Sequence, residues 1–102
     1  TIGHLTGRTH RIEIWFVAHD GSVWVNAGAR ESSHWVQNLM ADRRLELQIG
    51  SRRWSAVATI HPDLAEHPAR RALAARYQGW EAPAPLSAWA TDGLLVQIEP
   101  ER

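Results

Sequence analysis

The sequence contains no cysteine and no lysine in its 102 residues. The lack of cysteine excludes a disulfide framework, a thiolate zinc site and a cysteine nucleophile, and an intracellular protein is the simplest expectation. A chain of this length buries roughly 60–68% of the surface that its unfolded form exposes. We therefore expect a single domain, residues 1–102, that folds without a metal or a disulfide.

An excess of charge of either sign is also missing. Eleven arginines balance eleven acidic residues, and the arginines occur singly or in pairs rather than in runs. A general nucleic-acid surface would need a clear positive excess, so we expect no nucleic-acid partner. No apolar run approaches the roughly 20 residues that span a bilayer. The composition thus predicts a soluble, cytoplasmic protein with no integral membrane segment.

Phenylalanine and tyrosine are scarce, with one residue of each, whereas tryptophan occurs six times. An exposed tryptophan is costly, and a domain of this size cannot bury six of them completely. We expect some of them to line a pocket or the interface of a homodimer.

Alternating apolar and polar residues predict five strands. They span residues 11–18, 23–27, 45–49, 54–60 and 94–98. Asp20-Gly21 is a hairpin signal that makes the second strand antiparallel to the first. Strands joined mostly by hairpins favour a mainly β fold, a small antiparallel barrel, over a sheet of βαβ units.

Two helices are predicted between these strands. One runs from Ser32 or Ser33 to near Asp42, and the other from about residue 63 or 68 to Gln78, with Gly79 as its C-cap. Residues 81–89 have no periodicity and contain two prolines, so they are predicted as a loop.

The stretch Asn26–Asn38 combines the end of a strand, a turn at Gly28 and a capped helix start. Free backbone N–H groups at a helix start attract anions, and Arg30 lies beside them in the sequence. The alternative is an ordinary strand-to-helix connection, because glycine turns with serine caps are common. Residues 1–11, with two glycines, three threonines and four cations or potential cations, are predicted as a turn rich in donors.

Two motifs carry a resemblance to a known family. Thr-x-Gly-x-x-Thr-Gly-Arg at residues 1–8 precedes the first long strand, and an Ala-Gly loop is followed by His-Trp-x-x-Asn-Leu at residues 34–39. In their joint order these motifs resemble the deazaflavin-dependent nitroreductase family, within the flavin-binding split β-barrel superfamily. The resemblance implies a PNP oxidase-like split barrel that binds coenzyme F-420. It also implies hydride transfer to quinones, nitroaromatics or other electron-poor acceptors.

The resemblance implies cofactor-binding residues in both motifs. The phosphate-bearing tail of the coenzyme would be held by Gly3, His4, Gly7, Arg8, His10 and Arg11. The deazaflavin ring would lie along Gly28, Ala29 and Arg30, beside Trp35 and Asn38 of the helix. Alternatively, Trp35 is a core anchor and Asn38 a cap within the barrel.

The acceptor would meet aromatic residues near the predicted loop, namely Tyr77, Trp80 and Trp89. These side chains could instead pack against the barrel end or a second subunit. No sequence pattern identifies a catalytic side chain or a metal site; His61 and His67 are interpreted as surface or capping residues. This lack is compatible with a coenzyme that carries the chemistry itself.

The chain also departs from the family pattern. His4, Leu5 and His10 stand where members often carry basic residues, and a neutral imidazole holds phosphate less firmly than a guanidinium. Two alternatives therefore stay open beside an F-420-dependent oxidoreductase. One is an FMN-binding split-barrel reductase, and the other is a non-catalytic carrier of flavin or haem.

Overall fold

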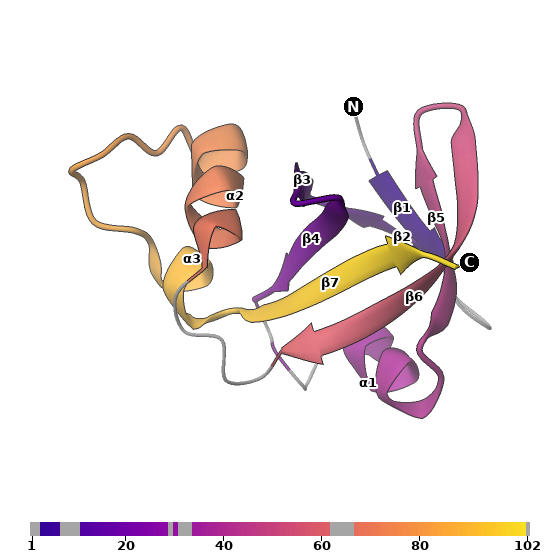
Figure 1. Ribbon diagram of the computed structural model, residues 1–102. Coiled ribbons are helices and arrows are strands. Elements are labelled where there is room, and N and C mark those ends of the chain that lie inside the picture. Colours follow the sequence, from indigo (N-terminus) through magenta and orange to yellow (C-terminus); the bar gives the residue numbers. More distant parts are fainter. Residues whose placement is uncertain (1–2, 7–10, 29, 31–33, 62–66, 102) are drawn as a thin grey trace.

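The computed structural model describes residues 3–6, 11–28, 30, 34–61 and 67–101. These residues form one antiparallel sheet of seven strands in the order β2-β1-β5-β6-β7-β4-β3 (Figure 1). The strands are β1 (Gly3–Thr6), β2 (Arg11–Ile14), β3 (Phe16–His19), β4 (Ser22–Ala27), β5 (Arg44–Ile49), β6 (Arg52–His61) and β7 (Leu94–Pro100). The helices are α1 (His34–Ala41), α2 (Pro68–Gln78) and α3 (Ala88–Asp92).

The two edge strands of the sheet, β2 and β3, are neighbours in the chain and are separated only by Trp15. Strand β2 pairs with β1, where Ile14 faces Gly3, whereas β3 pairs with β4, where Phe16 faces Val25. Because one continuous segment supplies both edges, the sheet must curl until its edges approach each other. The expected antiparallel barrel is therefore confirmed, but the single strand predicted over residues 11–18 is wrong and is two strands.

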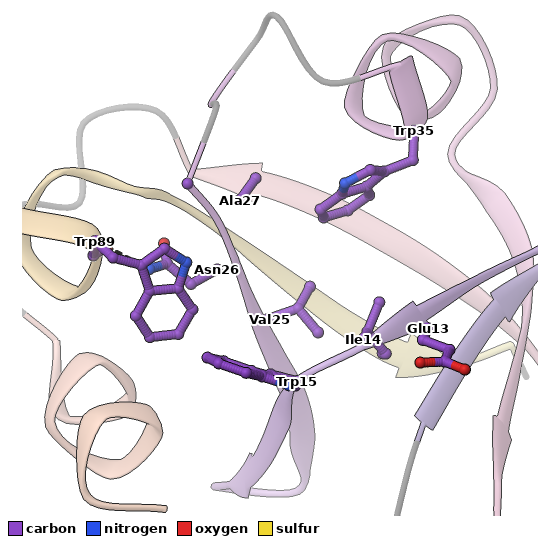
Figure 2. Close-up of a pocket in the computed structure, with 9 residues that line it drawn as sticks. Glu13, Ile14, Trp15, Val25, Asn26, Ala27, Trp35 and Trp89 are labelled. Carbon is purple, nitrogen blue, oxygen red and sulfur yellow. Dashed lines mark hydrogen bonds between the residues drawn. The ribbon is translucent and has the colours of Figure 1, made fainter. Parts of the chain in front are cut away.

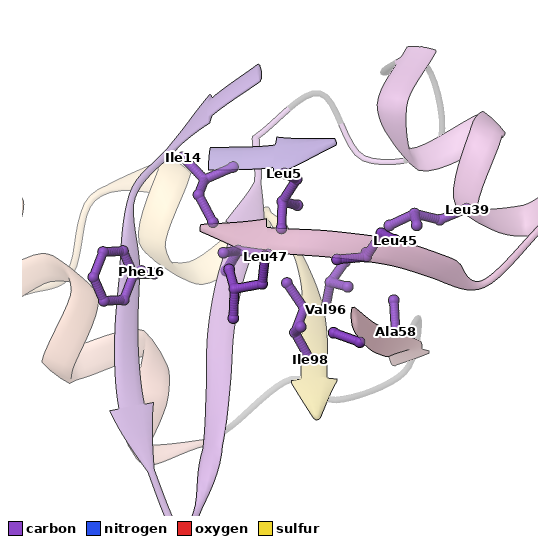
Figure 3. Packing of buried hydrophobic residues seen from close by; sticks show 11 residues of the cluster. Leu5, Ile14, Phe16, Leu39, Leu45, Leu47, Ala58, Val96 and Ile98 are labelled. Carbon is purple, nitrogen blue, oxygen red and sulfur yellow. The ribbon is translucent and has the colours of Figure 1, made fainter. Parts of the chain in front are cut away.

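The core of the barrel is formed by inward-facing residues of these strands (Figure 3). Its buried members are Leu5, Ile14, Phe16, Val25, Leu39, Leu45, Leu47, Ala56, Ala58, Val96 and Ile98. The inward positions predicted for β5, β6 and β7 are confirmed by the burial of Leu47, Ala58 and Val96, but Leu95 between the inward positions of β7 is also buried, in the cluster with Leu73 of α2. Leu39 brings α1 onto this core, and Val36 packs with Ala27 in a smaller cluster.

The outer face of β3 and β4 is covered by α2, which lies with α3 on one side of the sheet, while α1 lies elsewhere beside β6 (Figure 1). Val17 and Trp24 pack there against Ala69 and Leu73. The predicted end of α2 is confirmed by Gly79, which takes the left-handed conformation with φ of 64°. Because α2 covers the outer face of β4 and the barrel core covers its inner face, no residue of β4 is exposed.

Two expectations about local structure are wrong. Residues 3–6 are not a turn but strand β1, which pairs with both β2 and β5. Gly3 fits there because a Cβ would lie 2.8 Å from the Phe16 ring. The predicted loop 81–89 runs into a third helix, α3, whose first residue is Ala88 and whose N-cap Ser87 accepts a hydrogen bond from the Ala90 N–H. Among the described residues, no helix has the length and apolar character needed to cross a membrane.

Candidate functional site

A pocket of about 250 Å³ lies between β2 and β4, two strands that do not pair with each other (Figure 2). Its walls come from β2 and the residue after it, from β4 and the following turn, and from two helices. The lining residues are Glu13, Ile14, Trp15, Val25, Asn26, Ala27, Gly28, Trp35 and Trp89.

The pairing of the strands explains why an opening exists here. Strand β4 pairs with β7 as far as Ala27, but its pairing with β3 stops at Val25. Strand β2 pairs with β1 on one side, and within the described residues no strand pairs with its other side. Backbone N–H and C=O groups of two strand edges are thus left available beside the pocket, where a ligand with amide-like groups could bond to them.

Aromatic side chains form much of the wall. Trp35 of α1 and Trp89 of α3 approach the pocket from opposite sides, with Trp15 at a third side (Figure 2). Trp15 is 51% exposed, and its ring meets the edge of the Trp89 ring with centroids 5.5 Å apart. Flat apolar walls of this kind favour a planar ligand.

Glu13 is the only ionisable side chain among the described lining residues. It is exposed at the margin of the pocket, where its carboxylate makes that side unfavourable for an anionic group. The rest of the wall is apolar or amide, so it provides no acid and base pair for catalysis by side chains.

Gly28 and Trp89 fit each other closely. A Cβ on Gly28 would lie 2.7 Å from the indole Cδ1 of Trp89, so a larger residue there would push the indole away. The helix that carries Trp89 is tied to the same strand, because Asn26 Nδ2 donates a hydrogen bond to the Trp89 carbonyl at 2.6 Å. The turn after β4 and α3 thus form one side of the pocket together.

Of the residues predicted to bind the ring, Gly28 and Trp35 line the pocket. Arg30, with a positive φ of 51°, lies outside the lining and donates from Nη1 to the Asp92 carbonyl at 2.7 Å. Asn38 is exposed on α1 and is also not part of the lining. Ala29 lies outside the described residues.

The described residues among those predicted to bind the phosphate tail, Gly3, His4 and Arg11, do not line the pocket. Gly3 is buried, His4 is half-buried next to it on β1, and Arg11 donates to Gln48 Oε1 at 2.8 Å. Gly7, Arg8 and His10 lie outside the described residues.

The three residues predicted to meet the acceptor are in different places. Trp89 lines the pocket, and Tyr77 lies behind Trp15, whose ring it stacks on. Trp80 does not line the pocket; its indole N–H donates to the Ala84 carbonyl at 2.7 Å. The expectation that some tryptophans line a pocket is confirmed by Trp15, Trp35 and Trp89.

Sequence reasoning did not select Glu13, Trp15 and Asn26 as site residues, although they line the pocket. One signal could have found Trp15: the alternation places it on the face opposite to Ile14 and Phe16, so a large aromatic side chain points out of the barrel core.

Two histidines outside the pocket have structural partners. His67 Nδ1 accepts a hydrogen bond from the Ala69 N–H at 3.0 Å, so of the two predicted roles, surface or capping residue, the structure shows the cap. His61 Nε2 lies 3.0 Å from Gln97 Oε1. Within the described residues, no group of three or more histidines and carboxylates is arranged to hold a metal ion.

Residues 1–83 match the model of a family described as F420H(2)-dependent quinone reductase. No curated protein matches the sequence.

Solved structures resemble the whole chain. Protein Rv2991 of Mycobacterium tuberculosis, a conserved hypothetical protein, is 21% identical with a TM-score of 0.78, and the match covers 99% of this chain and 73% of Rv2991. A candidate pyridoxamine 5'-phosphate oxidase of Listeria innocua is 14% identical with a TM-score of 0.70, covering 99% of this chain and 84% of its own. An FAD-binding protein of Mesorhizobium loti is 15% identical with a TM-score of 0.65, and the match covers 99% of this chain and 79% of that protein. These likenesses support the split-barrel fold.

Proposed function

Because the chain belongs to the F420H(2)-dependent quinone reductase family, it is an oxidoreductase that uses coenzyme F-420, and we propose that its acceptor is a quinone or a nitroaromatic. The observation that carries the proposal is the pocket between β2 and β4, with its tryptophan walls and two available strand edges. An electron-poor planar acceptor and a planar coenzyme ring can both stack on these flat aromatic walls.

The residues present fit the ring of F-420. Its edge carries C=O and N–H groups that could bond to the backbone groups that residues 26–28 direct away from β7, since β3 does not pair with these residues. Gly28 leaves space that a Cβ would occupy. Backbone donors are also suited to a ring edge on which negative charge develops.

The pocket is too small to hold both the ring and the tail of the coenzyme. Its volume of about 250 Å³ lies below the usual range of ligand pockets, which is about 300–1,000 Å³. We therefore propose that, of the coenzyme, only the ring enters this pocket, where the acceptor stacks on it beside Trp89, and that the phosphate-bearing tail lies outside the pocket, away from the Glu13 carboxylate. The resemblance assigns the tail to Gly3, His4, Gly7, Arg8, His10 and Arg11, of which Arg11 is an exposed cation on β2.

When bound in its reduced form, the coenzyme supplies a hydride. The protein's part is to hold the ring edge by backbone groups, to exclude water with Trp15, Trp35 and Trp89, and to place the acceptor against the ring. A quinone that takes up a hydride needs one further proton to become a hydroquinone. Solvent can supply this proton at the exposed Glu13 side of the pocket.

The test begins with binding. The purified chain is titrated with F-420, FMN and haem, and we expect F-420 to bind more tightly than the other two. Reduced F-420 is then mixed with menadione and, separately, with a nitroaromatic, and its oxidation is followed by absorbance. Binding of FMN or haem in preference to F-420 would contradict the proposal. Binding of F-420 without oxidation by any acceptor would favour the carrier alternative.

The homodimer and the cytoplasmic location expected from the sequence stay predictions. Trp15 supports a homodimer because it leaves about half of its surface exposed beside the pocket. Sedimentation of the purified chain would measure whether two copies associate.

A further inference from the structure

The position of Trp89 depends on a helix that cannot hold its place alone. Helix α3 has five residues, and isolated helices shorter than about 12 residues are unstable in water. Yet this helix supplies Trp89, which forms one side of the pocket together with Gly28 (Figure 2). Other elements must therefore fix it.

Side chains from three different segments bond to the backbone carbonyls of α3 and of the residue after it. Asn26 of β4 donates to the Trp89 carbonyl, and Arg30 donates to the Asp92 carbonyl at 2.7 Å. Arg70 of α2 donates from Nη1 to the carbonyls of Ala90 and Gly93, at 3.0 and 2.9 Å. The carbonyls of Ala90, Asp92 and Gly93 lie at the C-terminal end of the helix, where carbonyls have no helical N–H partner, whereas the Trp89 carbonyl also accepts a hydrogen bond from the Gly93 N–H at 3.2 Å.

Arg70 is an unusual residue to find in this place, because it is only 4% exposed. Burial lowers the pKa of its guanidinium, nearby Arg30 lowers it further, and Asp92 opposes both effects. A buried charge is costly unless it is well hydrogen-bonded. The bonds of Arg70 to two buried backbone carbonyls indicate that its role is to join α2 to α3.

Close packing adds a second constraint on the same helix. The Asn26 side chain lies so close to Gly93 that a Cβ there would overlap its amide group. Gly28 also lies close to the Trp89 indole on the pocket side, where an added Cβ would be 2.7 Å from Cδ1. Strand β4 and helix α2 therefore hold α3 between them, and the indole has little freedom to move.

We propose that Arg70 is a positioning residue: together with Asn26 it fixes α3 so that Trp89 narrows the pocket and limits the size of the acceptor. The proposal rests on the proposed function, because it assigns the Trp89 wall to an acceptor pocket. Without Arg70, the carbonyls of Ala90 and Gly93 lose these bonds, and the C-terminal end of the helix is no longer bonded to α2, which then holds α3 through the Ser87–Gln78 hydrogen bond and apolar packing. The indole can then move away from Gly28, and wider acceptors can enter.

The first test measures the position of Trp89 without any coenzyme. The protein is prepared with fluorotryptophan, and its fluorine NMR spectrum is assigned by Trp89→Phe. In Arg70→Met we expect the Trp89 signal to move toward that of free fluorotryptophan. In the control Arg71→Met, which changes the exposed neighbour on the same helix, it should stay in place. If Arg70→Met fails to fold, Arg70→Lys keeps the charge but lacks the guanidinium fork. An unmoved Trp89 signal in the folded variant would overturn the proposal.

The second test measures acceptor selectivity as the ratio of kcat/KM for phenanthrenequinone to that for menadione. We expect this ratio to rise several-fold in both Arg70→Met and Trp89→Ala. Adding Arg70→Met to Trp89→Ala should not raise it further, because the residue acts through the indole. General destabilisation would lower both rates and leave the ratio unchanged, which would contradict the proposal.

The two tests separate two kinds of failure. If the wild-type protein oxidises reduced F-420 with neither quinone, the proposed function fails, while the NMR experiment still decides whether Arg70 positions Trp89. If turnover is present but the ratio is the same in Arg70→Met and Arg71→Met, the inference about Arg70 is wrong and the proposed function stands.

Discussion

Trp15 and Tyr77 stack with ring centroids 4.8 Å apart and planes inclined by only 1°. The Tyr77 hydroxyl also accepts a hydrogen bond from the Phe16 N–H and donates one to the Phe16 carbonyl, at 3.0 and 3.1 Å. One side chain of α2 thus supports the point where β2 ends and β3 begins.

Replacing Tyr77 by phenylalanine should keep the stack and remove both hydrogen bonds. We expect a loss of about 1–2 kcal/mol in the free energy of unfolding, because a partly buried backbone N–H loses its partner. Urea denaturation measures this loss. In Tyr77→Leu the stack is lost as well, so a further decrease of about 0.5–1.5 kcal/mol is expected. Equal stability of the wild type and Tyr77→Phe would show that the hydroxyl contributes nothing.

Replacing Gly28 by alanine should weaken the binding of F-420. The new methyl group meets the Trp89 indole, whose helix is held by Asn26 and Arg70, so the indole or the turn must shift and the pocket wall that they form together is distorted. Overpacking of this kind costs roughly 1–3 kcal/mol. Isothermal titration of F-420 measures the change.

The matched control for Gly28→Ala is made in a Trp89→Ala background, where the contact is absent. There the same substitution should leave the affinity for F-420 unchanged. Equal weakening in both backgrounds would mean that Gly28 acts through something other than its contact with Trp89.

Acid should destabilise the protein through His67. Burial lowers the pKa of this histidine below its ordinary value of 6.5. The nearby His19, His61 and Arg70 lower the pKa further, whereas Asp20 raises it. The cap supplied by Nδ1 requires an unprotonated nitrogen, which agrees with this direction. The unfolded chain therefore takes up a proton more readily than the folded one. The contribution of the unprotonated His67 cap to the free energy of unfolding is complete above pH 6.5. It is lost as the pH falls through the lower pKa that His67 has in the folded state.

His67→Asn provides a cap that does not titrate. Urea denaturation between about pH 8 and about pH 5 should show a smaller loss of stability for this variant than for the wild type. His34→Asn, which changes an exposed histidine on α1, should behave like the wild type. The same pH dependence in His67→Asn and the wild type would rule out His67 as a source of the acid sensitivity.

The alternation of side chains predicted which residues face the core but not which strands pair. Ile12, Ile14 and Phe16 alternate without interruption, so residues 11–18 resemble one strand. The change of partner from β1 to β4 occurs at Trp15 and leaves the alternation intact. Register with distant strands is a non-local property that a pattern within eight residues cannot contain.

Helix α3 escaped prediction because five residues make little more than one turn, too few for a helical period. The pocket was predictable only in part for a related reason. The resemblance pointed to Gly28 and Trp35, and the aromatic residues near the predicted loop pointed to Trp89, but the contact between Trp15 and Trp89 forms only because the sheet curls and α2 holds α3 beside β4. Such contacts join residues more than seventy positions apart in the chain.

Arg8→Ala should weaken the binding of F-420 by roughly tenfold or more, because a charge-assisted hydrogen bond to phosphate contributes about 1.5–3 kcal/mol. Arg8 lies outside the described residues, and its assignment to the tail comes from the resemblance of residues 1–8 to the nitroreductases. Titration of F-420 measures the effect, and Arg71→Ala on the exposed face of α2 serves as the control. An affinity equal to that of the control would assign the tail to other residues.

The most direct measurement is the rate at which menadione oxidises reduced F-420 in the presence of the protein, with hydrogen or deuterium at the hydride-bearing carbon. We expect the protein to accelerate the oxidation in proportion to its concentration, and deuterium to slow it, because the hydride moves within the bound complex. Oxidation at the same rate with and without the protein would contradict the claim that this chain is an F-420-dependent reductase of quinones.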